Sequence, residues 1–69
     1  MVGLNKLSEL DINVLPINAK VKSMLSYTDG IVTEKNVDTG MVHIQWSQGD
    51  IVSDTTHHIS RLNTVVLMK

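Results

Sequence analysis

Short apolar segments separated by turn residues run from residue 18 to the end of this chain, and this regular punctuation favours an antiparallel all-β fold. In the clearest segment, Met41–Ser47, the side chains of Val42, Ile44 and Trp46 alternate with mostly polar ones and are expected to face the core together. The same pattern predicts five strands in all. They are Ala19–Leu25, Ile31–Asn36, Met41–Ser47, Ile51–Thr56 and Leu62–Met68.

Turn residues fix the connections between these strands. We predict turns at Tyr27–Gly30, at Asp38–Gly40 and at Gln48–Gly49, each ending in a glycine that tolerates a left-handed backbone. His57–Arg61 fits neither the strand nor the helix period, which predicts a single 3-10 turn before the last strand.

The N-terminal part of the chain is less regular. Leu4, Leu7 and Leu10 are three residues apart, as on one side of a short helix, and Pro16 predicts a bend or an edge strand. We therefore expect residues 1–17 to form a short helical or extended segment that packs on a domain formed by residues 18–69.

The last predicted strand is apolar on both faces. Val65, Val66, Leu67 and Met68 follow one another, so that strand alternation leaves apolar side chains on the second face. Either the N-terminal leucines or a partner subunit must cover that face. We predict Val66 and Met68 as protein-binding residues, together with the only two aromatic residues, which are Trp46 and Tyr27.

Composition excludes several classes of protein. The chain has 69 residues, no cysteine and a net charge of −1, which rules out disulfide frameworks and thiolate zinc sites and gives no broad field for binding nucleic acid. No apolar stretch is long enough to cross a bilayer, and the N-terminus lacks the pattern of a signal peptide. We expect a cytoplasmic protein, or one in the host cell cytoplasm if it is viral.

The strand pattern resembles the SH3-like small β-barrel. The residues that carry the resemblance are Asp29–Val32 and Gly40–Gly49, which are similar to the hairpin of KOW-, Tudor- and Mib-Herc2-like domains and of small bacterial and phage proteins. The resemblance covers residues 18–68 and implies a five-stranded barrel, without selecting a partner. Two aromatic residues are too few for the aromatic cage of a methyl-lysine reader or the groove of a proline-rich-peptide binder.

Charged and histidine side chains suggest only simple binding chemistry. Lys20, Lys22 and Lys35 would form a basic stripe on the first hairpin, and Arg61 is suited to a phosphate or carboxylate. His57 and His58 are adjacent and would point to opposite sides of an extended chain, so they predict no shared metal.

The sequence predicts no catalytic residues, no cofactor and no small-molecule substrate, because no nucleophile, phosphate loop or metal set has recognisable spacing. Our first hypothesis is a non-enzymatic binding module, an accessory protein of a phage or bacterium that docks on a larger protein. One alternative is a nucleic-acid-binding barrel that uses Lys20, Lys22, Lys35 and Arg61. The other alternative is a structural homo-oligomer.

Overall fold

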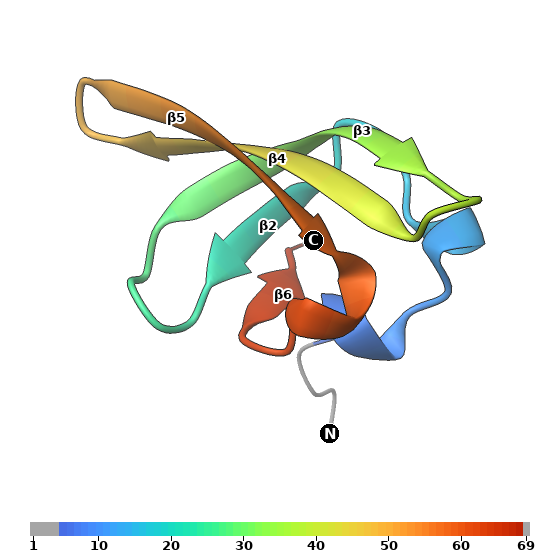
Figure 1. The fold of residues 1–69 in the computed structure, drawn as a ribbon. Coiled ribbons are helices and arrows are strands. Elements are labelled where there is room, and N and C mark those ends of the chain that lie inside the picture. The colour runs from blue at the N-terminus through green and yellow to red at the C-terminus, as the bar shows by residue number, and fades with distance from the viewer. Residues whose placement is uncertain (1–4, 69) are drawn as a thin grey trace.

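A computed structural model describes residues 5–68 of the chain, which form a curled antiparallel sheet with three 3-10 turns (Figure 1). The described part contains no α-helix, and the predicted all-β class is confirmed. In chain order the elements are β1 (Asn5–Lys6), η1 (Leu7–Glu9), η2 (Ile12–Val14), β2 (Lys20–Ser23), β3 (Asp29–Asn36), β4 (Met41–Gln48), β5 (Ile51–His58), η3 (Ile59–Arg61) and β6 (Val65–Leu67).

The strands lie in the order β1-β6-β2-β3-β4-β5, and every neighbouring pair is antiparallel. Strands β2 to β5 form a meander, and β6 returns after η3 to lie between β1 and β2. Among residues 5–68 no ladder joins β5 to β1 or β6. The sheet is therefore open, with β1 and β5 at its edges.

The core lies on the concave side of the curled sheet. Val21, Val32, Val42 and Ile44 are no more than 1% exposed there, as the alternation in β4 predicts. Leu7 and Leu15 belong to the same buried cluster, so the segment before β2 fills part of the core. The remaining buried members of this cluster are Leu62 and Val65.

The N-terminal segment, which we expected to be helical or extended, forms β1 and two 3-10 turns. Leu4 lies outside the described residues, Leu7 begins η1, and Leu10 is half-buried against the core. The Asp11 carboxylate accepts a hydrogen bond from the Asn13 N–H at 2.9 Å, which caps η2. The segment is thus extended with single turns, because each leucine is placed by the core rather than by a helical repeat.

The turn between β2 and β3 differs from the prediction. Asp29 and Gly30 lie inside β3, and the left-handed residue of the turn is Tyr27, with φ of 55°. The two other predicted glycine turns are confirmed, since Gly40 has φ of 77° and Gly49 has φ of 62°. Gly30 instead leaves room for the ring of Trp46 to pack against its backbone.

A β-bulge in β3 changes which side chains face the core. The register shifts between Val32 and Glu34, so Thr33 is the extra residue and Lys35 lies opposite the buried Val42. Because one added residue reverses the alternation, Lys35 turns to the concave side, away from the face that carries Lys20 and Lys22.

Candidate functional site

Of the two residues of the last predicted strand that were expected to bind a partner, Val66 is buried and Met68 is exposed. Val66 is 3% exposed, and β6 lies between β1 and β2 instead of at an edge. The prediction that Val66 forms a contact surface is therefore wrong for the folded chain. Met68 is 38% exposed, and its N–H donates to the Lys20 carbonyl at 2.8 Å.

The predicted basic stripe is divided between two faces. Lys20 is exposed on the convex face, where the Lys22 amine lies 4.0 Å from the exposed Asp29 carboxylate. Lys35 does not join them. Its Nζ donates to the carbonyls of Ile12, Asn13 and Leu15 at 2.9, 3.2 and 2.6 Å, so its charge binds the N-terminal segment to β3.

A groove of about 340 Å³ opens on the concave side between the β4–β5 hairpin and the η3–β6 segment. Trp46, Leu62 and Val65 supply its apolar surface, while Arg61 and His57 supply its basic groups. The structure thus brings together Trp46 and Arg61, two predicted site residues from distant parts of the sequence. Hydroxyl groups complete the lining, from Ser23, Ser26, Thr28, Ser53, Thr55 and Thr64.

The indole of Trp46 is held at two points. Its Nε1–H donates to the Thr55 hydroxyl at 2.7 Å, and its six-membered ring packs against Gly30. A Cβ atom on Gly30 would lie 2.7 Å from Cε3 of this ring and 2.9 Å from Cγ2 of Ile44. The half-buried Trp46 also packs against the core cluster, so it serves both the core and the rim.

Replacing Gly30 with alanine is expected to displace Trp46 and to lower the free energy of unfolding by about 1–3 kcal/mol. The added methyl group overlaps the ring, and the neighbouring Ile44 is fully buried and cannot yield. Chemical denaturation followed by Trp46 fluorescence measures both effects. A Gly49→Ala variant is a useful comparison, because an added Cβ there meets no atom within 4 Å and strain comes only from its left-handed backbone.

The three histidines have separate structural roles. His57 lines the groove, while the ring of His58 lies over Gly40 and its Nδ1 accepts from the Ser60 N–H at 3.2 Å. His43 contacts the Thr56 hydroxyl through Nδ1 at 2.7 Å. Within residues 5–68, no three His, Cys, Asp or Glu side chains are grouped as metal ligands would be.

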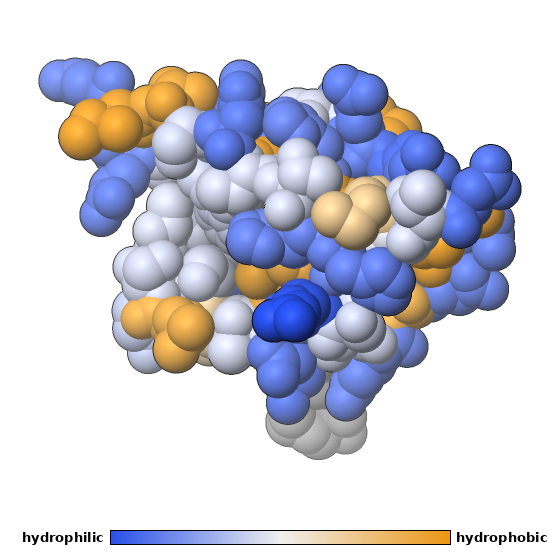
Figure 2. Space-filling model, in the orientation of Figure 1, coloured by the Kyte–Doolittle hydropathy of each residue, from blue (hydrophilic) through white to orange (hydrophobic). Residues whose placement is uncertain are grey.

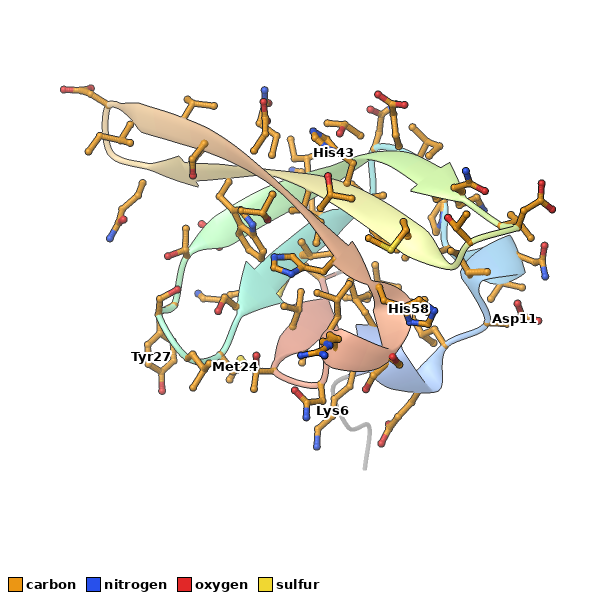
Figure 3. All side chains as sticks on the ribbon, in the orientation of Figure 1. Lys6, Asp11, Met24, Tyr27, His43 and His58 are labelled. Carbon is orange, nitrogen blue, oxygen red and sulfur yellow. The ribbon has the colours of Figure 1, made fainter. Side chains whose placement is uncertain are left out.

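Figure 3 shows Tyr27 and Met24 at one end of the molecule and His43 and His58 on other elements. Tyr27 is 70% exposed in the β2–β3 turn. It does not line the groove that holds Trp46. The two aromatic residues therefore do not share this groove, although Ser26 and Thr28 on either side of Tyr27 line it.

Strand β5 is a long open edge. It has eight residues, all exposed except the half-buried Thr55, and it contains no lysine, arginine or proline. Beyond its last pair with β4, the N–H of Ile59 donates to the Gly40 carbonyl at 2.8 Å. The β4–β5 register has no shift, so the backbone groups of β5 alternate in direction along the whole strand. The N–H and C=O groups of its odd-numbered residues point toward β4, and those of its even-numbered residues point away from the sheet.

The outward-facing backbone groups of β5 belong to Val52, Asp54 and Thr56, with His58 at the strand end. In the described part of the chain, β5 pairs only with β4, so the N–H and C=O groups of the first three face no neighbouring strand. The hairpin also projects beyond the rest of the sheet (Figure 1). Figure 2 shows apolar side chains at its projecting end, where Ile51 and Val52 are 68% and 58% exposed.

Sequence reasoning did not find this edge or the hydroxyl-lined groove. The side chains of Ser53, Thr55 and His57 extend from β5 to the concave side and line the groove. Because these side chains are polar, nothing in the sequence indicated that they face the inside of the curled sheet. Ile51–His58 carries no lysine or proline, the residues that often mark natural edge strands, so its sequence did not indicate an edge.

Comparison with known proteins found no matching family model, no matching curated protein and no matching solved structure. Across residues 5–68, the structure has no helix with the length and apolar character needed to span a membrane.

Proposed function

We propose that this protein is a non-enzymatic binding module that docks on a larger protein by adding one extended segment of that protein to β5. The observation that carries the proposal is the row of unpartnered backbone groups at Val52, Asp54 and Thr56. Such a row is a template for strand addition, in which main-chain hydrogen bonds provide affinity and side chains provide selectivity.

Side chains beside the edge define the partner segment. Val52 is exposed at the hairpin end, and Asp54 is exposed two residues further along the same face. Cross-strand neighbours in antiparallel sheets prefer apolar pairs and opposite charges. We therefore expect an extended segment with an apolar residue beside Val52 and a basic residue beside Asp54.

The strand order also supports the finer resemblance to an SH3-like barrel. A four-strand meander, a 3-10 turn and a last strand that returns beside the first meander strand are the arrangement that this resemblance implies. Domains of this type bind peptides, nucleic acids or neighbouring subunits, so the resemblance is compatible with docking and does not select it.

Replacing Asp54 with proline is expected to abolish partner binding while leaving the chain folded. Proline removes the outward N–H of residue 54, which makes no bond to β4, and edge strands accept proline at such positions. The matched control is Asp54→Ala, which removes the same carboxylate and keeps the N–H. Affinity capture from the source cells after nuclease treatment, with quantitative mass spectrometry, compares the two variants with the wild type.

We expect one protein at near-equal molar amount with the wild type, a reduced amount with Asp54→Ala and none with Asp54→Pro. Equal recovery with both variants would exclude strand addition at β5. The molecular mass in solution tests pairing between two copies of the chain. A mass that doubles as the wild-type concentration rises, but stays at the monomer value in Asp54→Pro, would favour such pairing instead.

A further inference from the structure

The concave groove is separate from the outer side of the β5 edge and has its own chemistry. Trp46 offers an aromatic surface, and its orientation is set by the 2.7 Å hydrogen bond to Thr55 and by contact with Gly30. A ring fixed in this way loses little freedom when a flat ligand stacks on it.

The ionisable residues that line this groove are both basic. Arg61 is exposed, lines the groove and makes no ion pair within the described residues. His57 lies on the inner face of β5 and lines the same groove, and none of the lining residues is acidic. An arginine fork with no carboxylate nearby is suited to an oxyanion, which it can bind through two parallel hydrogen bonds.

The remaining lining consists of hydrogen-bonding groups. Six hydroxyls and the Gln48 amide line the groove together with the indole and the guanidinium, and a hydroxyl can donate or accept. The groove volume of about 340 Å³ lies at the small end of the range for small-ligand sites. A ligand that matches all three features has a flat ring, an anion and hydroxyl groups between them.

We infer that the groove binds a nucleoside phosphate, either free or as one unit of a single strand, with its base on Trp46 and its phosphate at Arg61. The sugar then lies among the hydroxyls of Ser53, Thr55 and Thr64. This site does not depend on the proposed docking at β5, because its ligand enters the concave side and uses no outward backbone group of that strand.

Trp46 is the only tryptophan, so its fluorescence reports directly on the groove. The probes are adenosine monophosphate, adenosine, inorganic phosphate, thymidine monophosphate and hexathymidylate, each titrated into the full chain. We expect saturable quenching by adenosine monophosphate, and weaker binding of adenosine because it lacks the phosphate. Arg61→Gln should weaken the binding of adenosine monophosphate by about tenfold or more, since hydrogen bonds to charged groups are the strong ones.

Lys22→Gln is the matched control, because it also removes one positive charge but lies on the convex face. It should leave the affinity for adenosine monophosphate within about twofold, as expected for an exposed and screened charge. If hexathymidylate binds more tightly than thymidine monophosphate, the natural ligand is a single strand. If the two bind equally, the natural ligand is a free nucleotide, and both results support the inference. Equal affinity for adenosine and its monophosphate, an equal loss in both variants, or no quenching by any probe would overturn it.

Discussion

Replacing Leu15 with alanine is expected to lower the free energy of unfolding by about 2–5 kcal/mol, the range for truncating a fully buried leucine. Leu15 is 0% exposed and belongs to the same core cluster as Leu7 and residues from β2, β3 and β4. Pro16 follows it directly and restricts the backbone, so the site has little freedom to collapse around the cavity.

Leu25→Ala is the control for this experiment, because Leu25 lies in the β2–β3 turn with 79% of its side chain exposed. It should change the free energy of unfolding by no more than about 0.5 kcal/mol. Urea denaturation of both variants gives the comparison. Equal small losses would contradict the placement of the segment before β2 in the core.

Replacing Lys35 with methionine should lower the free energy of unfolding by about 1.5–3 kcal/mol, the range for a hydrogen bond to a charged group. Methionine keeps most of the aliphatic stem but leaves the carbonyls of Ile12, Asn13 and Leu15 without their shared donor. Two of these bonds are partly buried, so water replaces the donor incompletely.

The control is Lys20→Met, which removes an exposed lysine on the convex face of the same sheet. Thermal or chemical denaturation should show little change for this variant, and amide exchange in η2 should accelerate only in Lys35→Met. A Lys35→Met variant as stable as Lys20→Met would show that the three carbonyl contacts contribute nothing measurable.

The strands were predictable because their signal is local. Alternation of Val42, Ile44 and Trp46 with polar residues depends only on the pleat, and the positive φ of Gly40 and Gly49 follows from the turns beside that strand. The 3-10 turn before the last strand was also predicted, and it begins at Ile59, two residues later than expected.

The errors came from contacts between segments that are distant in sequence. Gly30 was assigned to a turn, yet it lies in β3, where only a residue without a side chain fits against Trp46. Lys35 was assigned to one basic stripe with Lys20 and Lys22, and the bulge at Thr33 turns it to the opposite face. Val66 was assigned to the surface, but it is buried, with a relative exposure of 3%.

The candidate site was predicted only in part. Trp46 and Arg61 were named individually from their side-chain chemistry, and their meeting in one groove depends on how far the sheet curls. The edge of β5 is open because the sheet does not close, and no local pattern in Ile51–His58 predicts whether the sheet closes.

Amide hydrogen exchange of the isolated monomer, measured by NMR along β5, tests whether this edge is free for strand addition. An open β5 edge predicts alternation, with slow exchange at the odd-numbered residues bonded to β4 and fast exchange at Val52, Asp54 and Thr56. Addition of the partner segment should then slow these three amides. Uniform protection along β5 in the monomer would show that the edge is already covered, and it would contradict docking by strand addition.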